Sequence, residues 1–318
     1  QFTNILLHQY LYNPAYAGSI KGMQFNAGYR HQWAGFDGAP RVYMASGYGT
    51  LKKKPKMAVG GLVINDQAGL INRTSLYGSY SYHLKLTETL KLGFGLSLGY
   101  VQYNLKAYNA KPYDLDDNRL SSSILNGNAL DANSGFYLYG KKFFLGFSGQ
   151  QLTSWKINWY SGSKSKLTNH FYGYAGYNFT LDKKKKEYVL QPSVLLRYSD
   201  PAPYELEYNL KLTYRNLVWL AGSFRHAKTV TNIDKKWQNN SFCGLLGVTV
   251  SKQFNLGYSY DFGLSNIQKY NNGSHEIIIT YTMFSKKGVI TDKVQNADEE
   301  ELNNIDNSIK TNIKSKKK

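Results

Sequence analysis

Cysteine and long apolar runs are nearly missing from this chain of 318 residues. Cys243 is the single cysteine, which excludes an intramolecular disulfide framework and any zinc or iron–sulfur site built from several cysteines. The mean hydropathy is −0.47, and no apolar run reaches the length of about 18 residues that a transmembrane helix needs. Amphipathic helical periodicity is also nearly absent from 20 to 285, so the structural signal must lie in another period.

Motifs for catalysis or metal binding are missing as well. The Ser121–Ser123 run lacks a nucleophile-elbow pattern, and the glycine pairs Gly93-x-Gly95 and Gly47-x-Gly49 lie within predicted strands, where we expect them to pack in the interior. The histidines show no metal-binding spacing and stand at the ends of predicted strands, which indicates interfacial or rim packing: His8, His31, His83, His170, His226 and His275. We therefore assign no catalytic, cofactor-binding or metal-binding residue and expect no enzyme.

Aromatic residues, glycine and positive charge are what the chain has in excess. Aromatics make up 15% of it, with 28 tyrosines, and there are 29 glycines. This aromatic content excludes a disordered protein. Apolar and polar side chains alternate with period 2 in many segments, which is the pattern of strands with one apolar face. Clear examples are 23–32, 90–100, 206–215 and 254–263.

The alternating segments predict about 14 strands. Most are roughly twice as long as the 5 or 6 residues typical of globular proteins. The predicted ranges are 22–34, 40–51, 56–65, 70–83, 89–104, 131–140, 142–151, 167–181, 187–199, 204–215, 216–226, 241–252, 253–263 and 274–285.

The connections between these strands also alternate. Every second one is short or rich in lysine, as at 52–55, 140–142 and 182–186. The intervening set contains the long ones, of which 105–130 is the longest, but three of that set stay short, around 35–39, 66–69 and 200–203. Short turns at one rim, longer loops at the other and an even strand number are typical of an antiparallel transmembrane β-barrel with periplasmic turns and extracellular loops. A large soluble β-sandwich or jelly roll is the alternative.

Aromatic and charged residues take separate places in this prediction. Tyr103, Tyr188, Tyr198 and Phe284 near strand ends would form the interfacial girdles. Charged residues on the polar faces would pair across the lumen and fill it, since 14 strands lie between small filled barrels and open porins. They are Arg30, Glu205, Glu207, Lys211, Arg215, Asp261 and Glu276.

Three segments follow from these patterns. Residues 1–20 form a lead-in segment outside the barrel, although in the transporter alternative below this segment would enter the lumen, and 21–285 form the barrel itself. Residues 286–318 form a polar periplasmic tail whose composition fits a flexible extension and a short helix over 297–310 equally well. Both ends of the barrel domain would lie on the short-turn side, which is the periplasm in an outer-membrane barrel. Because the sequence opens at Gln1, we expect a mature protein exported to the outer membrane after removal of a signal peptide.

The formal charge of +18 raises the question of partners. Nucleic-acid binding would need lysines and aromatics interleaved on one surface. Here the lysines gather in turns and at the C-terminus, whereas the aromatics occupy alternate strand positions. We therefore expect contact with anionic lipid headgroups or an acidic partner, and no nucleic acid.

Five stretches carry a family resemblance: 9–19 (QYLYNPAYAGS), 29–40 (YRHQWAGFDGAP), 219–225 (WLAGSFR), 258–262 (YSYDF) and 273–277 (GSHEI). Together they resemble the PorP/SprF family of outer-membrane proteins of the type IX secretion system in Bacteroidota, in the family's order over roughly 5–285. The motif residues to which we assign a structural or partner-binding role are Asn13, Pro14, Tyr16, Gly18, Trp33, Gly35, Phe36, Asp37, Gly38, Pro40, Asp261, His275 and Glu276.

The resemblance implies an outer-membrane barrel that serves secretion of proteins with a C-terminal sorting domain, including gliding adhesins. Implied partners are outer-membrane lipid, periplasmic ring or peptidoglycan-associated components, and a secreted adhesin. It supplies no catalytic residue and no cofactor. A barrel of 14 strands is too narrow for a folded protein, so we predict an accessory, adaptor or anchor. The alternative is an outer-membrane transporter of small solutes or hydrophobic compounds.

Overall fold

A computed structural model describes residues 4–20, 22–106, 124–157, 165–182, 187–199, 202–228, 237–264, 268 and 270–283. The predicted tail 286–318, Phe284, the Ser121–Ser123 run and most of the loop predicted at 105–130 lie outside the described residues.

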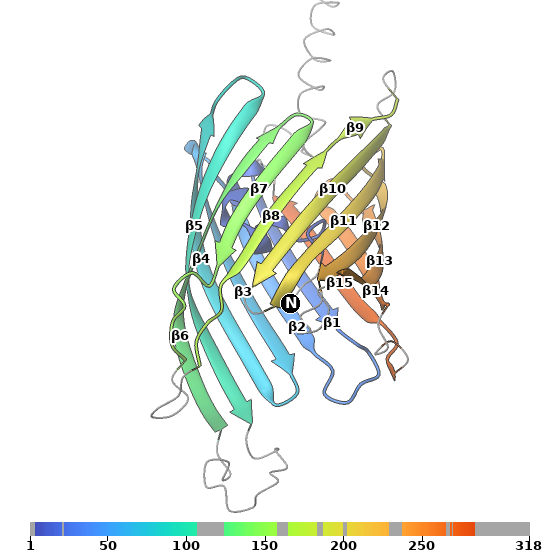
Figure 1. The fold of residues 1–318 in the computed structure, drawn as a ribbon. Coiled ribbons are helices and arrows are strands. Elements are labelled where there is room, and N and C mark those ends of the chain that lie inside the picture. The colour runs from blue at the N-terminus through green and yellow to red at the C-terminus, as the bar shows by residue number, and fades with distance from the viewer. Residues whose placement is uncertain are drawn as a thin grey trace, which may run out of the picture.

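The described chain forms one closed antiparallel barrel, in which each strand pairs with its neighbours in sequence and β15 pairs with β1 (Figure 1). The strands β8 and β9 both pair with β10 and together make one position in the wall, so the barrel has 14 wall strands, as predicted. The bounds are β1 (Met23–His31), β2 (Arg41–Leu51), β3 (Lys54–Ala68), β4 (Ile71–Lys85), β5 (Leu90–Lys106), β6 (Ile124–Gly140), β7 (Phe143–Gln150), β8 (His170–Tyr177), β9 (Phe179–Thr180), β10 (Tyr188–Ser199), β11 (Ala202–Tyr214), β12 (Val218–Lys228), β13 (Trp237–Thr249), β14 (Phe254–Gly263) and β15 (Ser274–Met283).

Period-2 alternation sets the two faces of this wall, as the sequence predicts. In β5 the even positions point outward, and Leu98 is 63% exposed, whereas Ser97 beside it is buried. In β14 Leu256 points outward and Ser259 inward. An apolar outer face and a polar inner face are the arrangement of a barrel that sits in lipid.

Some strand boundaries differ from the prediction. β6 begins at Ile124 and not at 131, and pairs with β5 along its whole length. The strand predicted at 167–181 is interrupted at Asn178. The Asn178 backbone N–H donates to the carbonyl of Lys142, and its side-chain oxygen accepts from Gln191, so this residue leaves the ladder to bind both neighbours.

The longer connections gather at one rim (Figure 1), although that rim also carries the two-residue turn 69–70 between β3 and β4. We call the rim at Leu51, Lys85 and Tyr214 the short-turn rim and the opposite one the long-loop rim. At the short-turn rim Arg215 and Asn216 have φ values of 47° and 53°, and the N–H of Leu217 donates to the carbonyl of Tyr214. Two consecutive left-handed residues fit the twist of a two-residue hairpin turn. Arg215 is therefore an exposed turn residue paired with Glu187, and its predicted place in the lumen is wrong.

Residues 4–20 lie inside the barrel and not outside it, which corrects the prediction for this described part of the N-terminal segment (Figure 1). It contains a short helix α1 (Gln9–Tyr12) and a 3-10 helix η1 (Pro14–Ser19). The alternation that identified the wall strands could not place it, because it contains no strand. We call the described part of this segment, residues 4–19, the plug. Among the described residues, no helix has the length and apolarity to cross a membrane.

Aromatic side chains cover the outer face near both rims. Tyr188 and Tyr198 point outward as predicted and pack against Tyr214 and Tyr204, with ring centroids 4.8 and 4.6 Å apart. The predicted place of Tyr103 in the outer aromatic girdle is wrong. It lies on the inner face under the guanidinium of Arg73, which is 5.8 Å from its ring centroid, because Tyr103 has the same parity as the buried Val101.

The two glycine pairs differ in the face of the wall on which they lie. Gly93 and Gly95 face the lumen as expected, where an added Cβ would meet atoms of the plug. Gly47 faces outward beneath the ring of Phe25, so its predicted lumen position is wrong. The alternation of β2 explains this, since Met44, Ser46 and Tyr48 are its buried positions.

Candidate functional site

The plug is centred on the side chain of Asn13. Its amide nitrogen donates to the carbonyls of Phe136 (2.9 Å) and Phe147 (3.3 Å) on the wall, and its oxygen accepts from the N–H of Ala15 (2.9 Å). The last bond caps η1, for which Pro14 supplies a suitable first residue. One buried side chain thus starts the helix and fixes it to β6 and β7.

Further hydrogen bonds join the plug backbone to the same side of the wall. Ser148 donates to the carbonyl of Tyr12 at 2.6 Å, and Gln150 donates to that of Leu11 at 2.6 Å. Tyr139 donates to the carbonyl of Gly18 at 3.3 Å. These bonds satisfy buried carbonyls that water cannot reach.

Glycines on the inner wall let the plug backbone approach closely. A Cβ built on Gly95 would lie 2.2 Å from the nitrogen of Ala15, and one on Gly135 would lie 2.4 Å from Oδ1 of Asn13. On the plug itself, a Cβ on Gly18 would lie 2.2 Å from the ring of His83. Small residues on both surfaces therefore set the depth at which the plug sits.

Tyrosine rings complete this contact. Tyr10 stacks on Tyr48 with centroids 4.2 Å apart and shares a 2.6 Å hydrogen bond with Ser79, while Tyr12 meets Tyr172 edge to face at 5.1 Å. Burial raises the pKa of Tyr10, although its hydrogen bond opposes the rise, and burial also raises the pKa of Tyr12. Both phenols therefore remain neutral.

The opposite side of the inner wall carries a chain of ion pairs, as the sequence predicts for the polar faces. Arg30 lies 3.2 Å from Glu276 and 3.4 Å from Asp261, and Arg225 lies 2.8 Å from Asp261 and 3.0 Å from Glu207. The side chains of Arg30, Glu207 and Glu276 are at most 2% exposed. Each charge is buried next to charges of the opposite sign. Removal of one member of this ion-pair chain would therefore leave its neighbours buried without a counter-charge.

Arg197 extends the chain at its far end. Its guanidinium lies 2.8 Å from Glu207 and also pairs with Glu205, and it stands 5.8 Å from the ring centroid of Tyr12. At the near end, Nε2 of His8 lies 3.2 Å from Oε1 of Glu276. The plug therefore contacts the ion-pair chain at both of its ends, at Arg197 and at Glu276.

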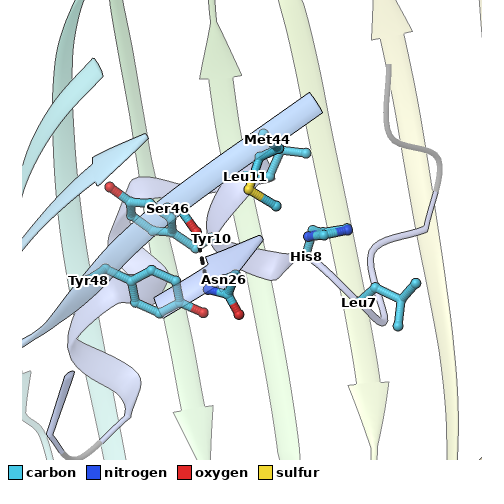
Figure 2. A pocket seen from close by; sticks show the side chains of 8 residues that line it. All are labelled: Leu7, His8, Tyr10, Leu11, Asn26, Met44, Ser46 and Tyr48. Atoms are coloured by element: carbon cyan, nitrogen blue, oxygen red, sulfur yellow. Dashed lines mark hydrogen bonds between the residues drawn. The ribbon is translucent and has the colours of Figure 1, made fainter. Parts of the chain in front are cut away.

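Little free space is left between the plug and strands β1 and β2. The pocket there has a volume of about 10 Å³, room for about one water molecule. Figure 2 shows the side chains that line it: Leu7, His8, Tyr10, Leu11, Asn26, Met44, Ser46 and Tyr48.

Two of the stretches that carry the family resemblance, 29–40 and 273–277, meet at the long-loop rim. The N–H of Trp33 donates to Oγ of Ser274 at 3.1 Å, and the N–H of Ala34 donates to the carbonyl of Gly273 at 2.8 Å. Gly35 has a φ of 99° and lies against Asn272. The loop 32–40 is thus fixed to the connection before β15, directly above the pair Arg30–Glu276.

A family profile described as type IX secretion system membrane protein PorP/SprF matches residues 1–281. The chain belongs to the PorP/SprF family. Among curated protein sequences, none matches it.

Solved structures share the barrel with this PorP/SprF chain. The toluene transporter TodX of P. putida is 10% identical, with a TM-score of 0.52 over 86% of this chain and 93% of its own. CymD, described as a monoaromatic hydrocarbon channel, is 13% identical, with a TM-score of 0.53 over 89% of this chain and 94% of its own. At such identities the similarity shows the fold alone, that of a membrane β-barrel like those of outer-membrane channels.

The PorP/SprF motif residues fall into three groups. Pro14, Tyr16 and Gly18 join Asn13 in the plug. Asp261 and Glu276 belong to the ion-pair chain. The third group lies in the loop 32–40 and consists of Trp33, Gly35, Phe36, Asp37, Gly38 and Pro40, of which all but Pro40 are exposed.

His275 joins none of these groups. It points outward, and its Nδ1 lies 2.8 Å from the hydroxyl of Tyr258. The predicted rim position is wrong for His8, which lies inside the barrel as part of the plug, whereas His83 near the end of β4 packs on the inner wall against Gly18 of the plug. The position of a histidine within a predicted strand carries no information about a segment that lies inside the barrel.

Four residues of the site were not predicted from the sequence: Arg197 and Arg225 in the ion-pair chain, and Ser148 and Gln150 in the plug contact. Arg225 stands in the WLAGSFR stretch, and both arginines lie at inward positions of alternating strands. Extending the face count to every strand would have found them. The period-2 alternation does not indicate that Ser148 and Gln150 contact a plug.

Proposed function

We propose that this protein is a non-enzymatic outer-membrane barrel of the type IX secretion and gliding machinery that acts as an accessory, adaptor or anchor. The observation that carries this proposal is the filled lumen, in which the plug and the ion-pair chain leave no route for a protein chain through the described part of the barrel. A larger component would form the conduit. Export after removal of a signal peptide belongs to the same proposal.

Charge supports a periplasmic role for the short-turn rim. Glu88 and Glu187, which lie among its cations, are themselves paired with Lys85 and Arg215. Besides Lys85, the exposed lysines of this rim within the described ranges are Lys52, Lys53, Lys54, Lys56, Lys91, Lys141, Lys142 and Lys252. We assign this rim, with the tail 286–318, to an acidic surface of a periplasmic ring or peptidoglycan-associated component.

The long-loop rim is the side we assign to the secreted adhesin. Trp33 and Phe36 are exposed on the loop 32–40, whose backbone is held against the connection before β15. Exposed aromatics on a rigid loop lose little conformational entropy when a partner binds. The motif residues of this loop would then be partner-binding.

The test is charge reversal of residues 52–54 to glutamate, with Lys106→Glu and Lys156→Glu at the long-loop rim as the matched control. We expect co-purification of periplasmic components from detergent-solubilised membranes to fall about fivefold in the first variant and to stay unchanged in the second. Equal recovery from both would overturn the assignment of the rim. Deletion of 286–318 tests the tail separately, and unchanged partners would remove it from the proposal.

The second reading, an outer-membrane transporter, is less well supported. TodX and CymD are described as carrying toluene and monoaromatic hydrocarbons. In this chain the inner wall beside the plug carries buried arginines and carboxylates, which suit polar groups and not a hydrocarbon. Uptake of a radiolabelled aromatic hydrocarbon by cells with and without the protein would detect such a function.

A further inference from the structure

The plug is held in two different ways along its length. Residues 9–19, which we call the anchor segment, contact strands β2 to β8 through backbone carbonyls, glycines and stacked tyrosines. Residues 4–8, which we call the latch segment, contact strands β12, β14 and β15, and Ile5 among them packs in a cluster with Leu195 of β10. The two segments meet at His8 and Gln9, at the start of α1.

Side chains hold the latch segment to the wall. Asn4 donates to Oγ of Ser223 at 3.1 Å, and His8 lies 3.2 Å from Glu276. The same Asn4 accepts from the N–H of Leu6 at 2.9 Å, which folds the segment on itself. Ile5 is buried in the hydrophobic cluster that includes Tyr12 of the anchor segment and Leu195 of β10, and this burial keeps the latch segment seated at rest.

A glycine gives the latch segment its seat. A Cβ built on Gly257 would lie 2.8 Å from Cδ2 of Leu7 and 2.8 Å from Cγ2 of Ile278. Both are the ends of flexible side chains. The seat is therefore a local fit of one leucine over one glycine, unlike the backbone contacts of the anchor segment.

The inner wall behind the latch segment contains buried hydrogen-bonding atoms that the described part of the protein does not pair. Buried side-chain atoms there have no hydrogen-bond partner among the described residues: Oε1 of Glu207, Nδ2 of Asn209, Nη2 of Arg225 and Oγ of Ser259. Donors and acceptors are both present, so water admitted to this surface would find partners for each. The aromatic wall around the anchor segment offers no comparable gain.

We propose that the latch segment swings away from the wall while the anchor segment stays seated, and that this opens a water-filled passage along the inner faces of β11 to β15 and β1. The passage conducts small hydrated ions and is too narrow for a protein. The pair His8–Glu276 keeps it closed, because it joins the hinge of the latch segment to a fixed charge of the wall. This conductance goes beyond the adaptor role and does not depend on it.

Single-channel recording of the full-length protein in planar bilayers tests this gate. Wild type is expected to be silent for most of the time, and His8→Ala to raise the open probability about tenfold, equivalent to about 1.4 kcal/mol. Tyr10→Phe, which removes the Ser79 hydrogen bond of the anchor segment, is the control and is expected to stay at the wild-type level. A silent His8→Ala barrel overturns the proposal.

A disulfide lock provides the second measurement. Leu7→Cys and Gly257→Cys are combined with Cys243→Ala and His8→Ala, so that oxidation ties the latch segment to its seat. We expect current under reducing conditions and none after oxidation. Current that survives oxidation in a fully cross-linked sample overturns the proposal, because the ions would then take another path. In the recordings without the lock, Gly257→Leu, which displaces Leu7 without changing a charge, replaces His8→Ala if that variant does not fold.

Discussion

The two sides of the inner wall hold the same plug by different physics. Strands β2 to β8 contact it through neutral groups, namely tyrosine rings, hydroxyls and glycines. Strands β10 to β15 and β1 face it with a chain of alternating guanidinium and carboxylate groups. The difference teaches that one side fixes the position of the plug by shape, whereas the other contributes only while all of its charges are paired.

The two sides should therefore respond differently to damage. On the neutral side a substitution removes or adds a defined contact, and its effect stays local. On the charged side, loss of one carboxylate leaves two guanidinium groups without their shared partner in a buried site. Variants that compare the two sides are thus the direct way to test this account.

The largest effect is expected for Glu207→Ala, since Arg225 (3.0 Å) and Arg197 (2.8 Å) share this carboxylate and its side chain is 0% exposed. We expect a loss of about 3–5 kcal/mol in the free energy of unfolding. Urea unfolding of the barrel in lipid vesicles, followed by tryptophan fluorescence, measures it. The control is Glu187→Ala at the exposed pair with Arg215, which should change little. Equal losses in the two variants would contradict the dependence on burial.

A smaller effect is expected on the neutral side for Gly95→Ala. The new Cβ would lie 2.2 Å from the nitrogen of Ala15 and 2.5 Å from the carbonyl carbon of Pro14, both backbone atoms that cannot rotate away. We expect a loss of about 1–3 kcal/mol and partial displacement of the plug. Limited proteolysis within 4–19 measures the displacement. Gly78→Ala is the matched control, because a Cβ there meets nothing within 4 Å, and equal proteolysis of both variants would show that Gly95 does not set the seat.

The wall was predictable from the sequence because its signal is local. Whether a residue such as Leu98 or Ser97 faces lipid or the lumen follows from its odd or even position in the strand. The closed barrel follows from the number and order of such strands. The place of Asn13 was not predictable in the same way. Its partners Phe136 and Phe147 offer backbone carbonyls, which any residue would provide, so no side-chain pattern marks the contact.

The charged side shows a second limit. Arg30, Asp261 and Glu276 were placed on inward faces correctly, but which carboxylate meets which guanidinium depends on the stagger between neighbouring strands. Register between distant strands is a property of the closed barrel and is not encoded in either strand by itself. The His8 contact to Glu276 needs both the register and the plug.

The smallest effect is expected where a salt bridge is fully exposed, at Lys85 and Glu88 in the short-turn rim, 2.6 Å apart. The hydrogen bond from Lys85 lowers the pKa of the Glu88 carboxyl below its usual range. A lowered pKa in the folded state means that the pair contributes stability above the unfolded pKa and loses it as the pH falls through the folded value. Lys85→Ala should therefore return the Glu88 pKa to its ordinary value, measured by NMR titration of the labelled carboxyl, while the unfolding midpoint at neutral pH stays the same. Solvent screens this pair, whereas the same charges on the inner wall have no water to replace a lost partner. A midpoint that falls as far as in Glu207→Ala would mean that burial is not what separates the two sites.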